Sequence, residues 1–192
     1  MSFSVEDVNE LFGPELELIG DAELAGKVGE CWIEAARLGG WKSASQVEEM
    51  PFTLLLDTRG IGFASHTRAV VRGALGLAEA MEKEFGEKLP RPIDKDVLVA
   101  GALLHDVGKL LEIEGDGKGG YRRSRNGKLF RHPISGAMLA HRLGLPDEVA
   151  HCIAVHSREG EGFHRSLEAQ IIHDADFATF DPLKLEDAGK LL

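Results

Sequence analysis

Apolar residues recur at spacings of three and four along most of this chain, the pattern of helices with one buried face. Clear runs of alternating apolar and polar residues, which would indicate strands, are missing from the sequence. We therefore predict an all-α fold. We expect helices over residues 5–12, 21–38, 45–50, 66–85, 97–111, 132–143 and 146–156, and a last helix that begins near residue 166.

Glycine and proline mark the expected breaks between these helices. Residues 41–62 contain Pro51 and two glycines and are predicted to be mainly irregular, whereas the glycine-rich, basic segment 115–128 is predicted to be a mobile surface loop. Ser65 is the expected N-cap of the helix over 66–85, and Asp94 that of the helix that follows. In the former helix, His66 shares a face with apolar residues and is expected to point toward the core.

Length, charge and cysteine content narrow the class of protein. A chain of 192 residues is expected to form one domain with a hydrophobic core. Its net charge of −10 argues against general nucleic-acid binding, although small anionic ligands fit local basic patches. Cys31 and Cys152 form no disulfide or zinc motif, and neither has a neighbouring base for nucleophilic catalysis. Without a recognisable signal peptide or membrane span, we expect a cytoplasmic protein.

The most informative residues are His105 and Asp106, which follow the apolar run 97–104. A histidine beside an aspartate in an apolar helix is costly to bury unless something binds both side chains. A divalent metal would do so. Further candidate ligands lie at helix ends or on core-facing stripes elsewhere, namely His66, His132, His156 and Asp176.

This ordered set, with the Gly-Lys that follows closely after His105-Asp106, the His-Pro at 132 and the Ala-Asp at 175–176, resembles the HD superfamily of metal-dependent phosphohydrolases. The resemblance covers roughly residues 63–183. It implies an HD-domain helical bundle over 63–192, with residues 1–62 as an N-terminal helical extension packed on it in one compact unit.

By the same resemblance, one metal is held by His66, His105, Asp106 and Asp176. His132 and His156 would add a second metal, with Asp106 bridging the two ions. Asp174 lies nearly opposite Asp176 on a helix, and the family's Ala-Asp pattern selects Asp176. The remaining histidines, His141, His151, His164 and His173, are interpreted as core or surface residues.

The ligand types suit a divalent transition metal such as Fe, Mn, Ni, Co or Zn better than calcium or magnesium alone. Two such ions about 3.5 to 4 Å apart would activate water for attack on a phosphoryl group. Lys109 lies three residues after Asp106 and resembles the lysine that offsets phosphate charge in related hydrolases. Basic side chains of the glycine-rich segment are candidates to clamp phosphates, namely Arg122, Arg123 and Arg125.

The leading hypothesis is a hydrolase, with Asp106 and Lys109 as catalytic residues, that cleaves a phosphomonoester or phosphodiester of a small metabolite or nucleotide. Two other classes stay open: a mixed-valent di-iron oxygenase of the same superfamily, with the same ligand order, and a non-catalytic regulatory HD module. The Gly-Tyr-Pro signature of the cyclic-dinucleotide phosphodiesterases is replaced by the residues Gly160-Glu161-Gly162-Phe163. Substrate, native metal and oligomeric state do not follow from the sequence.

Overall fold

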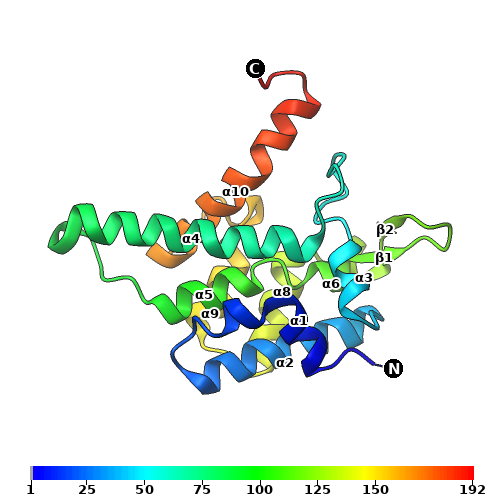
Figure 1. Cartoon of the computed structure of the whole chain (residues 1–192), viewed down its shortest axis with the longest axis horizontal. Coiled ribbons are helices and arrows are strands. Elements are labelled where there is room, and N and C mark those ends of the chain that lie inside the picture. The colour runs from blue at the N-terminus through cyan, green and yellow to red at the C-terminus, as the bar shows by residue number, and fades with distance from the viewer. Residues whose placement is uncertain (1) are drawn as a thin grey trace.

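The computed structural model describes residues 2–192 and is built almost entirely from helices (Figure 1). The predicted all-α class is confirmed. The α-helices are α1 (Val5–Leu16), α2 (Ala22–Gly39), α3 (Ala44–Glu49), α4 (Phe63–Phe85), α5 (Lys95–Leu104), α6 (Lys109–Glu112), α7 (Arg125–Leu129), α8 (His132–Arg142), α9 (Asp147–Val155) and α10 (Leu167–Asp187). Short 3₁₀ helices η1 (Gly86–Lys88) and η2 (Arg158–Gly160) and a hairpin of β1 (Ile113–Gly115) and β2 (Tyr121–Arg123) join them.

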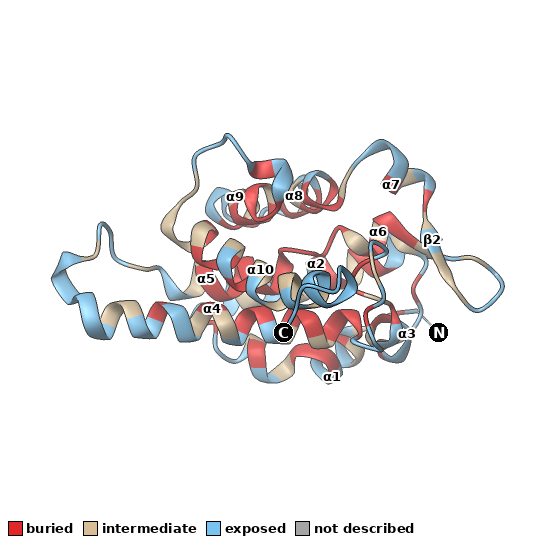
Figure 2. Cartoon of the chain, turned by 90° about the horizontal axis from the view of Figure 1, so that it is seen from above, coloured by how far each residue is buried: buried red, intermediate tan, exposed pale blue. Residues whose placement is uncertain are grey.

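Helix α5 forms the centre of the molecule (Figure 2). Its residues from Leu98 to Leu104 are all buried, and α2, α4, α9 and α10 pack around it. Gly101 allows two of these helices to approach, because a Cβ there would lie 2.8 Å from the Cβ of Cys152 on α9 and 2.9 Å from the Cδ1 of Ile172 on α10. The apolar run 97–104 of the sequence therefore lies in the helix at the centre of the core.

The N-terminal helices share the hydrophobic core with the rest of the chain. The Trp32 ring of α2 lies between Phe12 of α1, at a centroid distance of 4.5 Å, and Phe63 of α4, at 5.7 Å. Burial of such large side chains stabilises the contact of α1 and α2 with α4.

The prediction of one continuous helix over 97–111 was wrong. Helix α5 ends at Leu104 and α6 begins at Lys109, with a tight turn between them. In this turn the backbone N–H groups of Val107 and Lys109 donate to carbonyl oxygens three residues earlier, at 3.0 and 2.8 Å. Gly108 makes the turn possible, because a Cβ at this position would collide with the carbonyl oxygen of His132 at the start of α8.

The prediction of an irregular loop over 115–128 was also wrong for much of that segment. Strands β1 and β2 pair antiparallel, with Ile113 opposite Arg123, and α7 follows directly. Asp116 closes the hairpin tip by accepting the N–H groups of Lys118 at 2.7 Å and Gly120 at 2.9 Å. Strands of three residues are too short for an alternating pattern to reveal them.

Helix α4 begins at Phe63, with Gly62 as its N-cap, rather than at the expected cap Ser65. Phe63 donates its N–H to the carbonyl oxygen of Met50 at 2.7 Å, and the Ser65 hydroxyl instead donates to Glu48 at 2.6 Å. His66 consequently lies in the first turn of α4 and is buried. Across residues 2–192, we find no helix with the length and apolarity that a membrane crossing requires.

Candidate metal centre and active site

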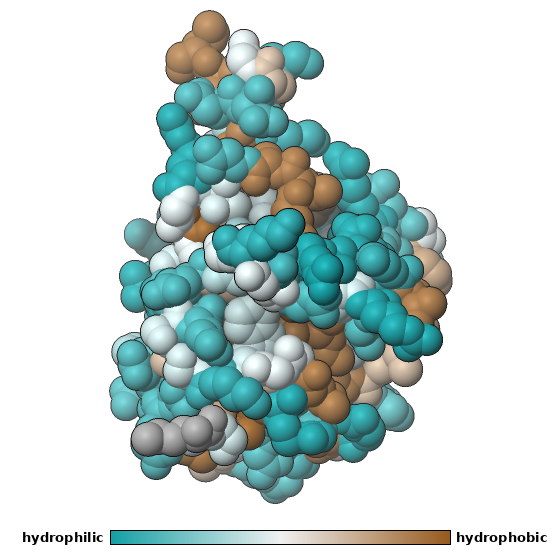
Figure 3. Space-filling view, turned by 90° about the vertical axis from the view of Figure 1, so that its right-hand side faces the viewer, coloured by the Kyte–Doolittle hydropathy of each residue, from teal (hydrophilic) through white to brown (hydrophobic). Residues whose placement is uncertain are grey.

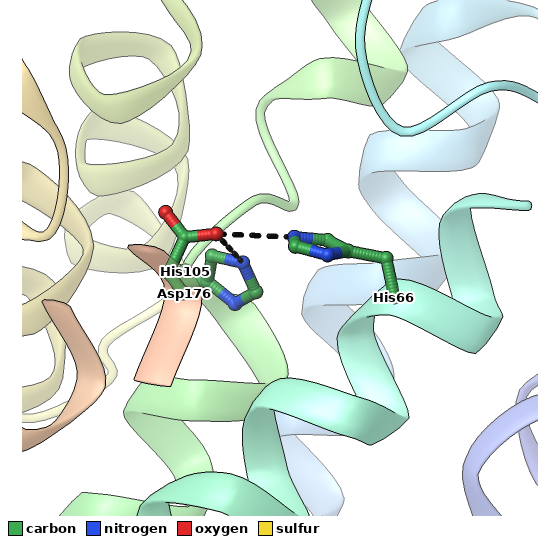
Figure 4. Close-up of side chains that lie close together, drawn as sticks. All are labelled: His66, His105 and Asp176. Carbon is green, nitrogen blue, oxygen red and sulfur yellow. Dashed lines mark ion pairs between the residues drawn. The ribbon is translucent and has the colours of Figure 1, made fainter. Parts of the chain in front are cut away.

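The six predicted ligand residues converge at one place in the fold, although they come from separate segments. They form two clusters, His66, His105 and Asp176 in one and Asp106, His132 and His156 in the other. Within each cluster the potential ligand atoms lie within 4.8 Å of one another. Figure 4 shows the first cluster, in which the Asp176 carboxylate of α10 faces the rings of His66 on α4 and His105 at the end of α5.

Asp106 joins the two clusters through its two carboxylate oxygens. Oδ2 lies 3.4 Å from Nε2 of His66 and 3.3 Å from Nε2 of His105. Oδ1 lies 3.1 Å from Nε2 of His132 and 3.5 Å from Nε2 of His156. A carboxylate that turns one oxygen to each cluster has the arrangement needed to bridge two cations.

Hydrogen bonds on the far side of the histidine rings define where their protons lie. Nδ1 of His105 donates to the carbonyl oxygen of Ala102 at 2.7 Å, and Nδ1 of His156 donates to that of Ile153 at 2.8 Å. Because a carbonyl oxygen only accepts, each Nδ1 carries a proton, and in the neutral ring Nε2 keeps a lone pair. These lone pairs point toward Asp106.

Four buried atoms of the cluster residues make no hydrogen bond within residues 2–192: Nε2 of His66, His105 and His156, and Oδ1 of Asp106. An imidazole lone pair and the carboxylate oxygen that it faces repel each other unless a cation or a proton lies between them. Neutral imidazole with carboxylate is also a donor set that transition metals favour. The residues present therefore fit divalent metal ions.

The charge states of the carboxylates are favourable for cation binding. Burial alone would raise the pKa of Asp106, but Lys109, His105 and His132 outweigh it and hold this pKa well below its usual value. Lys109 Nζ lies 2.6 Å from Oδ2 of Asp106. The pKa of Asp176 is also lowered: burial alone would raise it, but the His66 ring, with Nε2 3.2 Å from Oδ1, outweighs burial.

The pKa values of two of the histidines shift in opposite directions. Burial lowers the pKa of His156, which favours the neutral imidazole that a metal requires. For His66 burial acts in the same direction, but the carboxylates of Asp106 and Asp176, which lie 3.4 and 3.2 Å from its Nε2, outweigh burial and raise the pKa. A proton on His66 would therefore compete with a cation for the same position.

The clusters lie against a cavity of about 430 Å³, which is large enough for a small metabolite. The face of the molecule that carries the projecting end of α10 is mainly hydrophilic, with apolar side chains showing between the polar ones (Figure 3). Asp106, His132 and Asp176 line the cavity from the metal side. Its basic lining residues are Lys109, Arg123, Arg131, Arg158 and Lys184, and its apolar ones include Phe52, Leu54, Leu55, Leu56, Phe177 and Phe180.

The structure brings some of the predicted substrate residues to this cavity and not others. Lys109 and Arg123 line it. Arg122 is exposed and instead pairs with Glu114 across the hairpin at 2.9 Å, and the exposed Arg125 is not among the lining residues. The alternation of β2 explains the difference, because Arg122 and Arg123 point to opposite faces of the strand.

Sequence reasoning missed several residues of the site. Arg131 lies beside the ligand His132 in the sequence, a proximity that could have identified it. Glu112 lies behind His132 and accepts its Nδ1–H at 3.1 Å. In one continuous helix Glu112 and Asp106 would lie on different faces, so only the break before α6 brings them to the same histidine.

The residues set aside in the sequence lie outside the two clusters. Asp174 is exposed and accepts a hydrogen bond from Gln170 at 2.9 Å, whereas Asp176 lies in the first cluster. His173 donates from Nδ1 to the carbonyl oxygen of His156, and His141 is exposed. Cys31 and Cys152 are buried, and burial raises the pKa of each thiol to about 12, which disfavours the nucleophilic thiolate.

Comparison with known proteins gives matches of two kinds. Ribonuclease Y of Acidothermus cellulolyticus is 37% identical over 84 residues, 44% of this chain and 14% of that protein. Dihydroneopterin 2',3'-cyclic phosphate phosphodiesterase of Methanocaldococcus jannaschii is 31% identical over 166 residues, 84% of this chain and 65% of that protein. The chain thus spans less than two thirds of either relative, and no solved structure matches it significantly.

The family model of the HD domain matches residues 63–178, which extend from the first residue of α4 into α10. This range contains all six residues of the two clusters. The chain therefore belongs to the HD domain family.

Proposed function

We propose that this protein is a metal-dependent phosphohydrolase that cleaves a phosphomonoester or phosphodiester of a small metabolite or nucleotide. The observation that carries the proposal is the pair of His/Asp clusters joined by Asp106 at the wall of a cavity with basic side chains. The names of the relatives, a cyclic phosphate phosphodiesterase and a ribonuclease, support phosphate-ester chemistry.

In this proposal His66, His105, Asp106 and Asp176 hold one divalent cation, and His132 and His156 with Asp106 hold a second. Bound transition-metal ions would supply Lewis-acid polarisation of phosphoryl oxygen and lower the pKa of water. The protein's own contribution is to aim Nε2 of His105 and His156 at the clusters and to keep Asp106 ionised. Lys109 orients Asp106, since its ammonium also donates to the carbonyl oxygen of Phe52 at 2.6 Å and is thereby held in place.

The basic side chains of the cavity are proposed to bind the anionic part of the substrate. Arg131 is already engaged with Glu159 at 3.3 Å, whereas Arg158 and Lys184 make no ion pair within residues 2–192. Unpaired cations beside a metal site favour a phosphate ester over a neutral ligand. Arg158 and Lys184, rather than Arg122 and Arg125, are therefore the proposed phosphate contacts.

The apolar side chains that line the same cavity support a substrate whose organic part is flat or apolar. Phe177 and Phe180 on α10 face the cavity together with Leu54 to Leu56 of the loop before α4. Such a wall favours a substrate with a flat or apolar group over a bare sugar phosphate. A cyclic phosphate of a ring-bearing metabolite and an aryl phosphate ester both have this character.

The experiment is hydrolysis by purified protein loaded in turn with Mn, Co, Ni, Fe or Zn, using aryl phosphate mono- and diesters and nucleoside 2',3'-cyclic phosphates. We expect cleavage that depends on the metal. Asp176→Asn should reduce it by more than about 100-fold, because even partners of metal ligands contribute about 10 to 100-fold. Asp174→Asn, two residues away on the same helix, is the matched control and should retain activity.

Metal-loaded protein that cleaves none of these esters would contradict the proposal. Equal activity of the Asp174 and Asp176 variants would contradict the assigned ligand set. Iron-loaded protein that consumes oxygen instead of releasing phosphate would point to the oxygenase class.

A further inference from the structure

Glu112 is a buried carboxylate at the end of α6 that contacts His132 twice. Its Oε2 accepts the backbone N–H of His132 at 2.7 Å and the ring Nδ1–H at 3.1 Å. Only 6% of the residue is exposed. The two bonds reach the histidine from the side of the ring opposite Nε2, the atom that faces Asp106 at 3.1 Å.

Glu112 is held in its ionised form by its surroundings. Arg123 Nε lies 3.5 Å from Oε1, and Arg131 Nε lies 3.5 Å from Oε2. An ionised carboxylate has no proton to donate, so a neutral His132 must carry its proton on Nδ1.

The position of His132 in the fold explains why it needs a partner of this kind. His105 and His156 follow a helix, so their Nδ1 atoms reach the carbonyl oxygens of Ala102 and Ile153, three residues earlier in that helix. His132 is instead the first residue of α8 and has no preceding turn of its own helix beneath its ring. Glu112 of α6 accepts the Nδ1–H of His132, as backbone carbonyl oxygens do for His105 and His156.

We infer that Glu112 is a positioning residue that fixes the ring orientation and tautomer of His132, so that the Nε2 lone pair is aimed at the second cluster. The inference rests on the proposed function only for the role of His132 as a metal ligand. A carboxylate is a stronger acceptor than a carbonyl oxygen and increases the donor strength of the imidazole it holds. Glu112 therefore strengthens cation binding at the cluster of Asp106, His132 and His156.

The test is ¹⁵N NMR of the histidine rings in the metal-free, substrate-free protein, with the His132 signals assigned by their loss in His132→Asn. In the wild type, His132 should carry its proton on Nδ1. Glu112→Gln retains an acceptor and should keep this tautomer, whereas Glu112→Ala should give a mixture. Glu114→Ala on the adjacent strand, whose side chain pairs with Arg122 at the surface, is the matched control and should not change the signals.

Metal titration of the same variants gives a second measurement. Glu112→Ala should weaken metal binding by about 10 to 100-fold, Glu112→Gln by less, and Glu114→Ala not at all. A wild-type His132 with its proton on Nε2, or a folded Glu112→Ala variant with unchanged tautomer, would overturn the inference.

Glu112 also accepts the backbone N–H of His132 at the start of α8, so Glu112→Ala could fail to fold. In that case the wild type and Glu112→Gln decide the question, because a proton on Nε2 in either contradicts it. The tautomer measurement does not depend on whether the protein hydrolyses phosphate esters. A protein inactive on every ester but with the expected His132 tautomer would refute the proposed function and leave the inference standing.

Discussion

At the scale of single residues, the site brings lone pairs of imidazole nitrogens against carboxylate oxygens with no proton or cation between them. Nε2 of His105 lies 3.3 Å from Oδ2 of Asp106, and Nε2 of His132 lies 3.1 Å from Oδ1, although the opposite nitrogen of each ring already carries a proton. Either protons or cations must relieve this repulsion. The hydrogen bonds at the opposite nitrogen keep each ring in place whether a proton or a cation is bound.

Proton competition at His66 leads to a prediction about pH. Because its pKa is raised above 6.5 in the metal-free protein, His66 still carries a proton at pH values where an ordinary histidine has lost it. Metal binding should therefore release a proton near neutral pH, and the apparent affinity should increase as the pH rises through the raised pKa of His66.

Isothermal calorimetry at pH 7 in two buffers with different ionisation enthalpies measures this proton release. His141→Gln removes an exposed histidine outside the clusters and should leave the release unchanged. Metal binding without proton release at pH 7 would refute the raised pKa of His66.

At the scale of elements, the site depends on how closely helices approach α5. Gly101 faces both Cys152 and Ile172, and each would lie within 3 Å of an added Cβ. Gly76 on α4 is exposed, and a Cβ there would meet nothing within 4 Å. The same substitution should therefore have opposite effects at the two positions.

We predict that Gly101→Ala lowers the free energy of unfolding by about 1 to 3 kcal/mol, because the core is overpacked. Gly76→Ala should raise it by about 0.5 to 1 kcal/mol, since alanine has the higher helix propensity. Urea denaturation of both variants beside the wild type measures the two effects. A Gly101→Ala variant as stable as the wild type would mean that α9 and α10 pack less tightly against α5 than the structure indicates.

Some of these elements could be predicted from the sequence, and others could not. A helix with a clear apolar stripe and caps, such as α2 with its N-cap Asp21, could be predicted because periodicity and capping are local properties. The break at residues 105–108 could not, because it depends on Gly108 packing against α8. The hairpin is too short to show a period, and its Arg123 contributes to the cavity only through that hairpin.

The candidate site was more predictable than the path of the backbone around it. A buried His-Asp pair is costly enough to be conspicuous in a sequence, and the order of the other four residues matched a known pattern. Glu112, Arg158 and Lys184 carry no such local signal, because only the tertiary structure brings them to His132 and the cavity. The division into an N-terminal extension over residues 1–62 and an HD domain over 63–192 stays a prediction.

At the scale of the whole molecule, the segment before α4 and helix α10, far apart in the sequence, meet at the site. The Phe52 ring, from the segment before α4, stacks on His66 at a centroid distance of 4.3 Å and meets Phe180 of α10 at 6.2 Å. Arg59 of the same segment lies 3.5 Å from Glu186 near the end of α10. Figure 1 shows this segment, in cyan, rising beside α10, so the N-terminal part of the chain forms one wall of the cavity.

The central claim is that six side chains, Asp106 and the five around it, bind metal in the folded protein. Elemental analysis of protein purified without added metal, compared with Asp106→Ala, tests it most directly. We predict up to two divalent transition-metal ions per wild-type chain, and loss of both in the variant, because Asp106 faces both clusters. Wild-type protein that stays free of metal even after incubation with Mn, Fe, Co, Ni or Zn, or a variant with the same metal content, would contradict the claim.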